Sequence, residues 1–164
     1  MNRDRFVPRT KKARATALFL LHIALLCAPR AAMVLIPMDG TQNDHLRAYG
    51  LVYKALKRGL DAEWLLNYRG GSFAVTVDES VMLSARLHDI TLEELPAARL
   101  AQIRETISES NMESITLEKA PSVAVYTPPD KLPWDDAVTL ALSYADIPYE
   151  KIYDRDVLSG KLKT

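Results

Sequence analysis

Cysteine and histidine are scarce in this sequence. Cys27 is the only cysteine among 164 residues, and there are three histidines. A single cysteine cannot form an internal disulfide or supply a zinc site built from several cysteines. The histidines show no metal-ligand spacing, and no serine stands in the G-x-S-x-G context of a nucleophile elbow. We therefore predict no metal, no cofactor and no complete catalytic constellation in this chain.

The chain has no net charge, but its charges are unevenly distributed. Lys and Arg number 21, as do Asp and Glu. Seven of the basic residues and only one acidic residue precede Met33, so 14 basic and 20 acidic residues remain after it, a net charge of −6. A body of that sign repels a phosphate backbone. The composition therefore argues against nucleic-acid binding.

The first 32 residues have the layout of a secretory signal. A basic region extends to Arg14, and the apolar run ALFLLHIALLCA follows over residues 17–28. This run is short for a membrane span, which needs about 20 apolar residues. We predict a signal segment at residues 1–32, cleavage near Ala31 or Ala32, and export to the periplasm or the extracellular space. The membrane is then a partner only through the signal, and a buried N-terminal helix is the alternative.

Two segments of the chain have the pattern strand, helix, strand, which is typical of a βαβ unit. They predict an α/β fold, with a mostly parallel sheet of the Rossmann or flavodoxin type and flanking helices, incomplete at the C-terminus. The first unit is expected at residues 33–118 and the second at 119–164. The predicted elements are a strand at 33–37, a helix at 45–58 and a strand at 61–67, then a strand at 122–126, a helix at 134–145 and a strand at 149–153.

The residues between these segments predict further elements. We expect strands at 73–77 and 115–117 and a helix at 78–87. Thr91-x-x-Glu94 matches a capping box, which would open a longer helix towards residue 110. Both tryptophans, Trp64 and Trp134, fall on apolar elements and are expected to be structural. In the second unit we expect an apolar surface, where a partner would pack, around Val138, Leu142 and Ile152.

Polar residues follow the first predicted strand, at the edge where open α/β sheets usually bind ligands. His45 could act as a base, with Asp39 or Asp44 as the carboxylate that orients it. The alternative is helix capping in a solvated loop, because Asp and Asn are preferred N-cap residues. The candidate ligand-binding residues of this loop are Asp39, Thr41, Asn43, Asp44 and His45.

A second candidate follows the second predicted strand, where Arg69, Gly70, Gly71 and Ser72 are consecutive. Two glycines allow backbone amides to point at an anion, and the arginine adds positive charge. The spacing is not that of a P-loop or a dinucleotide fingerprint. A tight turn without any ligand is the alternative.

Three segments resemble an exported bacterial family whose members are commonly labelled asparagine synthetase B. They are VLIPMDGTQNDHLRAYGLVYKAL, EWLLNYRGGSF and KAPSVAVYTPP followed by PWDDAVTLALSYADIPYEKIYD, and together they cover residues 33–161 almost completely. The last of them also resembles the opening strand–helix–strand of the class I glutamine-amidotransferase-like fold. A glutamine-dependent asparagine synthetase has a cysteine after its first methionine and an S-G-G-x-D-S loop. This chain has Asn2 and Arg69-Gly70-Gly71-Ser72 instead, so no residue is assigned as catalytic.

Three functions remain open from the sequence. The first is the N-terminal part of an exported, amidotransferase-like α/β protein that is inert by itself. Its partner would be the missing C-terminal part of the same protein or a second copy of the chain. The second is a module that binds a small anion or a sugar through the two candidate loops. The third is glutamine-dependent asparagine synthesis, as the family label suggests.

Overall fold

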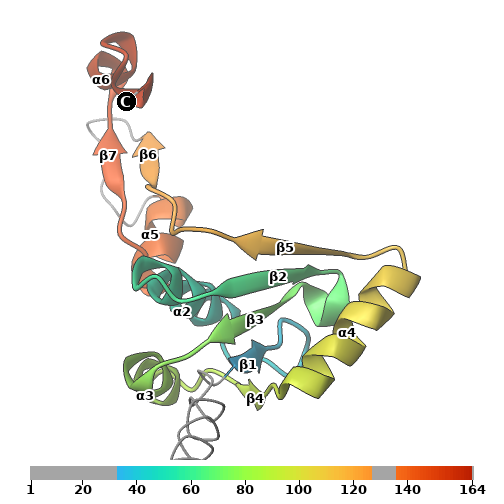
Figure 1. Cartoon of the computed structure of the whole chain (residues 1–164). Coiled ribbons are helices and arrows are strands. Elements are labelled where there is room, and N and C mark those ends of the chain that lie inside the picture. Colours follow the sequence, from blue (N-terminus) through green and yellow to red (C-terminus); the bar gives the residue numbers. More distant parts are fainter. Residues whose placement is uncertain (1–32, 127–135, 164) are drawn as a thin grey trace, which may run out of the picture. The chain divides into compact units, whose positions relative to one another are not determined.

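A five-stranded sheet with the order β4-β1-β3-β2-β5 forms the centre of the chain, and every neighbouring pair in it is antiparallel (Figure 1). This computed structural model describes residues 33–126 and 136–163, so the predicted signal segment at residues 1–32 and Trp134 lie outside the described residues. The strands are β1 (Met33–Ile36), β2 (Ala62–Leu66), β3 (Ser72–Thr76), β4 (Glu93–Glu94) and β5 (Glu113–Leu117).

The prediction of a mostly parallel Rossmann- or flavodoxin-like sheet is wrong. β1 and β2 run in the same direction, but β3 lies between them and pairs with both, as in Leu35↔Ala74 and Trp64↔Phe73. The cause is the short connection between β2 and β3. A few residues can join only antiparallel neighbours, whereas a parallel neighbour requires a crossover of about a dozen residues or more. The strand predicted at residues 73–77 is thus the second strand of a hairpin.

The connectivity β1-α2-β2-β3-α3-β4, with the strand order β4-β1-β3-β2, is the split βαβ arrangement called ferredoxin-like. Helices α2 (His45–Lys57) and α3 (Glu79–Leu87) pack on one face of the sheet. Val34 and Ile36 point to that face, while Leu35 points to the other, because side chains alternate along a strand.

Helix α4 (Ala97–Glu109) covers the other face, where Leu100, Ile103 and Ile107 pack with Leu35. The predicted capping box before this helix is not formed. Glu93 and Glu94 belong to β4, and the helix begins only after Pro96, which occupies the N-cap position. A proline disfavours helical backbone in the residue before it, so the chain stays extended up to Pro96.

The second predicted βαβ unit is present. β6 (Ala124–Tyr126) and β7 (Glu150–Ile152) pair in parallel, with α5 (Ala137–Tyr144) between them in the chain. A short helix α6 (Asp154–Leu158) and a 3-10 turn (Lys161–Lys163) follow. Of the apolar residues expected at its surface, Val138 is exposed and Leu142 half-buried, but Ile152 is buried.

Helix α5 ends against α2 at a glycine. A Cβ atom on Gly50 would lie 1.8 Å from the carbonyl oxygen of Ala145, so only glycine permits this approach. An ion pair between Lys54 and Asp146, 2.5 Å apart, stabilises the same contact. Glycine inside a helix costs about 0.5–1 kcal/mol relative to alanine. The close approach of α2 and α5 explains why a glycine is present at position 50 despite this cost.

Candidate functional site

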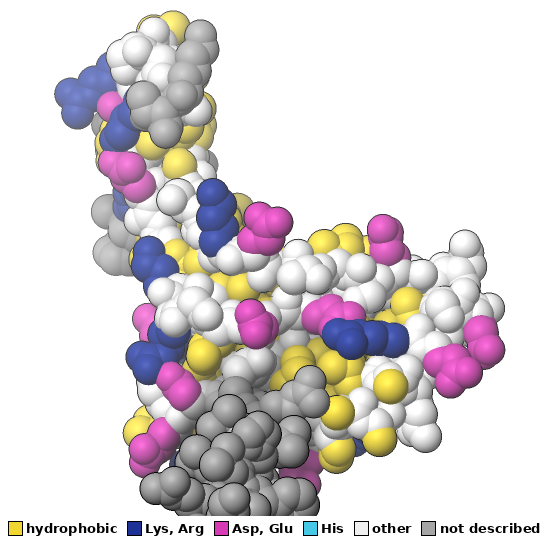
Figure 2. All heavy atoms as spheres, in the orientation of Figure 1, with side chains coloured by type: hydrophobic (Ala, Val, Ile, Leu, Met, Phe, Trp, Pro, Cys, Tyr) yellow, Lys and Arg dark blue, Asp and Glu magenta, His cyan; other side chains and the backbone are white. Residues whose placement is uncertain are grey.

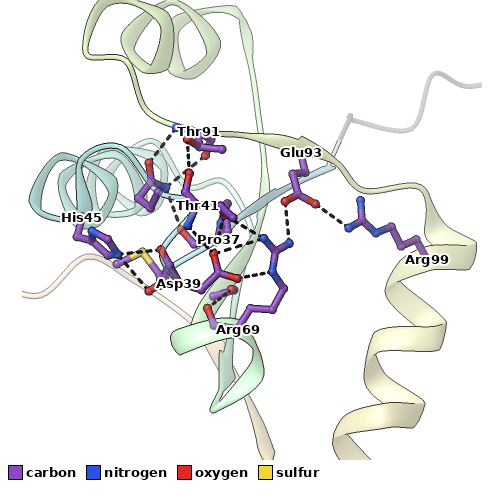
Figure 3. A network of polar contacts seen from close by, with 11 residues as sticks. Pro37, Asp39, Thr41, His45, Arg69, Thr91, Glu93 and Arg99 are labelled. Atoms are coloured by element: carbon purple, nitrogen blue, oxygen red, sulfur yellow. Dashed lines mark hydrogen bonds and ion pairs between the residues drawn. The ribbon is translucent and has the colours of Figure 1, made fainter.

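The two candidate loops lie side by side at one end of the five-stranded sheet (Figure 3). The Met38 amide donates a hydrogen bond to the Arg69 carbonyl oxygen across 3.2 Å. Gly70 has a φ of +81°, and a Cβ atom there would lie 2.3 Å from the carbonyl oxygen of Met38. The loops meet because β1 and β2 point the same way, so their carboxyl ends share an edge even with β3 between them.

Arg69 is the centre of the polar network drawn in Figure 3. Its Nε lies 2.7 Å from a carboxylate oxygen of Asp39, and its Nη1 lies 2.7 Å from a carboxylate oxygen of Glu93. Its Nη2 donates to the Thr41 hydroxyl across 3.0 Å. The other carboxylate oxygen of Glu93 lies 2.6 Å from Arg99. Each guanidinium nitrogen of Arg69 therefore already has an acceptor within the chain.

The arginine contacts of this network disfavour Asp39 and Glu93 as catalytic bases. The hydrogen bond from Arg69, with further ones from Thr41, holds the pKa of Asp39 far below its usual range. The hydrogen bond from Arg69 also lowers the pKa of Glu93, and these carboxylates raise the pKa of Arg69. A carboxylate with a depressed pKa is a weak base. Two carboxylates balance the two guanidinium groups, so the network also lacks the excess positive charge that attracts an anion.

The predicted pairing of His45 with a carboxylate does not form. His45 Nε2 lies 3.2 Å from the backbone carbonyl oxygens of both Met38 and Asp39. Asp44 is the N-cap of α2, because one of its oxygens accepts from the Arg47 amide at 2.9 Å. The other oxygen accepts from the Tyr144 hydroxyl at 2.5 Å. Burial by itself would raise the pKa of Asp44. The two hydrogen bonds lower it by more than burial raises it, so the pKa of Asp44 lies below the usual value. The capping interpretation is correct for Asp44.

The remaining candidates have internal contacts. The Ser72 hydroxyl donates to the Arg69 carbonyl at 3.0 Å, and the Gly71 carbonyl accepts from Trp64 Nε1 at 3.0 Å. Trp64 also stacks on Phe73, with ring centroids 5.9 Å apart, which agrees with the structural role predicted for it. The Asn43 amide donates to the Gln42 side chain at 3.1 Å. The turn at residues 69–72 thus uses its polar groups to close the hairpin.

Four residues of the network were missed from the sequence: Gln42, Thr91, Glu93 and Arg99. Gln42 is buried and connects two segments. Its amide nitrogen donates to the Pro37 carbonyl at 2.9 Å, and its oxygen accepts from the Thr91 amide at 2.9 Å. Glu93 reaches the network because β4 pairs with β1. A local sequence pattern does not predict contacts between segments so far apart in the chain. Only knowledge of the strand pairing could have revealed these contacts.

No family model matches this chain, and no curated protein and no solved structure matches it either. The resemblance to the family labelled asparagine synthetase B therefore stays a prediction. Within residues 33–126 and 136–163, no three His, Cys, Asp or Glu side chains gather closely enough to hold a metal ion. No helix in the same part of the chain is long and apolar enough to cross a membrane.

Proposed function

We propose that this chain is a non-catalytic assembly module. In this proposal β6, α5 and β7 form the first part of a parallel α/β sheet, and a further strand completes that sheet at the free edge of β6. The observation that supports the proposal most strongly is the pair β6–β7 itself. It is parallel, each strand has three residues, and neither strand has a second neighbour among the described residues.

A parallel sheet normally has both faces covered, and an isolated two-stranded pair is marginally stable in water. Here the crossover helix leaves apolar side chains in solvent: Val138 is 55% and Leu140 is 58% exposed. Residues two positions apart on a helix, such as Val138 and Leu140, are separated by about 200° around the helix axis. The helix is therefore apolar on more than one side. Figure 2 shows hydrophobic side chains at the surface of this part of the chain.

The two edges of the pair differ in charge. β7 contains Glu150 and Lys151, and Glu150 pairs with Lys161 at 2.5 Å. β6 is Ala124, Val125 and Tyr126, without any charged residue. Charged side chains on an edge strand oppose the addition of another strand, and an uncharged edge favours it. We therefore place the added strand at β6. We propose that it belongs to a continuation of the same protein, which is what the resemblance to the amidotransferase-like fold implies.

The test compares the 164-residue chain with a chain extended along its reading frame, by size-exclusion chromatography with light scattering and by thermal melting. The extended chain should melt at a higher temperature, because the added strand pairs with β6 and the rest of the continuation covers the apolar surface of α5. In the extended chain, Leu140→Glu should lower the melting temperature. Leu87→Glu, at a position 72% exposed on α3, should leave the melting temperature unchanged. A 164-residue chain that is monomeric and no less stable than the extended one would contradict the proposal. If the 164-residue chain is a dimer and the extension does not stabilise it, the partner is a second copy of the chain.

Export belongs to the same proposal and has its own measurement. Residues 1–32 combine a basic region with a short apolar run, the arrangement of a cleavable signal. Mass spectrometry of the mature protein should find its first residue within a few positions of Met33. A mature protein that still contains residues 3–14 would show that this part of the proposal is wrong.

A further inference from the structure

A groove of about 760 Å³ lies beside the C-terminal end of α2, between α3 and the connection from α5 to β7. It shares no lining residue with the network around Arg69. Its volume lies within the range of small-molecule sites, about 300–1,000 Å³. The sequence offered no motif here, since lysine and arginine are common in the last turn of a helix.

The lining of the groove is positive although the body of the chain is negative. Lys54, Lys57 and Arg58 line it, and Asp146 is its one carboxylate. Lys54 is paired with Asp146 at 2.5 Å, and Arg58 is paired with Asp78 at 2.6 Å. The charges of these two cations are balanced by their carboxylate partners. Lys57, by contrast, makes no ion pair with any residue that the structure describes.

Two serines of α3 line the groove together with Lys57. Ser80 and Ser84 are four positions apart on α3, so they lie on the same side of that helix. Like Lys57, neither serine side chain has a hydrogen-bond partner among the described residues. The groove thus combines an ammonium group and two hydroxyl groups that are available to a ligand. This is the reverse of Arg69, in which every guanidinium nitrogen already has an acceptor.

The lining of the groove also contains apolar side chains. Ile147 and Pro148 line it from the connection between α5 and β7, and Tyr53 lines it from α2. Ammonium and hydroxyl groups donate well to phosphate and carboxylate oxygens. A site that combines such donors with apolar side chains suits a ligand with an oxyanion at one end and an apolar group at the other.

We propose that this groove binds a small organic oxyanion. Lys57, Ser80 and Ser84 hold its charged group, and Ile147 and Pro148 contact its apolar part. Binding here does not depend on strand addition at β6, since none of the groove residues belongs to β6. The groove is therefore a second property of the chain, separate from its role in assembly.

The experiment uses isothermal titration of the 164-residue chain with inorganic phosphate, phenyl phosphate and benzoate at fixed ionic strength. Phenyl phosphate should bind saturably and more tightly than inorganic phosphate, because its ring can contact the apolar side chains of Ile147 and Pro148. Benzoate tests whether a carboxylate can replace the phosphate. Absence of saturable binding by all three probes would overturn the proposal.

Substitutions locate the site. Lys57→Gln should weaken phenyl phosphate binding about tenfold, because a charge-assisted hydrogen bond is lost. Ser84→Ala should weaken it by a smaller factor. The control is Lys119→Gln, an exposed position on the connection between β5 and β6, which should leave affinity unchanged. Circular dichroism confirms that each variant is folded. Equal affinity in the wild type, Lys57→Gln and Ser84→Ala would overturn the assignment to this groove.

Discussion

Two segments of this chain have the same order of elements but build different sheets. In the first, β1, α2 and β2 are followed by a hairpin turn, and β3 enters between the two parallel strands. In the second, β6, α5 and β7 are followed directly by α6, and the two strands pair with each other. The comparison shows that the order strand, helix, strand does not determine which strands pair. The residues after the second strand decide whether a third strand fits between the first two.

The two regions also differ in what they leave uncovered. The five-stranded sheet has apolar cores on both faces, and Leu35, Ile36, Leu65 and Val75 in it are fully buried. The pair β6–β7 has two buried apolar residues, Val125 and Ile152, while Val138 and Leu140 of its helix stay in solvent. The first region is therefore stable through its own contacts, whereas the second has surface left for a partner.

The largest expected effect is the loss of stability when a buried side chain of each region is truncated. Leu35→Ala should lower the free energy of unfolding by about 2–5 kcal/mol, because a fully buried leucine leaves a cavity. Ile152→Ala in the short strand β7 should cost less. Urea denaturation, followed by circular dichroism, measures both. Equal costs would show that the second region is as well packed as the first, and the contrast between them would fail.

The next effect concerns the contact that joins them. Gly50→Ala places a methyl group against the Ala145 carbonyl oxygen, and overpacking of this kind costs about 1–3 kcal/mol. Hydrogen exchange should show faster exchange of the α5 amides, while the amides of β1 and β3 keep their protection. Gly40→Ala is the control, because a Cβ there meets nothing within 4 Å and its φ is not positive. Unchanged exchange in α5 would mean that the two helices can separate without loss.

A smaller effect is the pH dependence of the Arg69 network. The folded-state pKa values of Asp39 and Glu93 lie below the ordinary values of 3.8 and 4.5. Their contribution to stability is therefore fully present above those values and is lost as the pH falls through and below them. In Arg69→Gln, the melting temperature should fall less steeply below pH 4.5 than in the wild type. Parallel curves for the two proteins between pH 2 and 7 would contradict this assignment.

The smallest expected effect is at Tyr144. Tyr144→Phe removes the hydrogen bond to Asp44 but keeps the ring, over which the Arg47 guanidinium lies 4.6 Å from the centroid. Asp44→Ala, which also removes the N-cap of α2, should cost about 1 kcal/mol. Tyr144→Phe should lower the melting temperature less than Asp44→Ala does. A larger loss from Tyr144→Phe would show that this hydroxyl, rather than the Gly50 contact, joins α5 to α2.

The positions of the elements could be predicted from the sequence better than their pairing. β2, α3 and α5 lie within a few residues of their predicted bounds. The error lay in the connection at residues 67–71, whose length demanded a hairpin although the flanking pattern suggested a crossover. At β4, the motif Thr91-x-x-Glu94 was outweighed by Pro96, which delays the start of α4.

The candidate site was found in part because loops at the carboxyl ends of β1 and β2 meet whatever lies between those strands. That Arg69 would already be paired could not be predicted, because Glu93 reaches it only through the pairing of β4 with β1. Lys57 was missed for the opposite reason. It lies in the last turn of a helix, where lysine is common. Only the serines of α3 that line the same groove distinguish Lys57 from other lysines at helix ends.

The position of β3 between β1 and β2 has a consequence for the order in which the sheet assembles. β2 and β3 are joined by a short turn, and a hairpin of this kind forms in about 1–10 μs. β1 can pair with β3 only after the chain has passed through α2 and the hairpin, so this contact costs more loop-closure entropy than the hairpin does. Until β1 arrives, one edge of β3 remains unpaired. The docking of β1 is thus expected to be slower than the formation of the β2–β3 hairpin, and it removes the unpaired edge of β3.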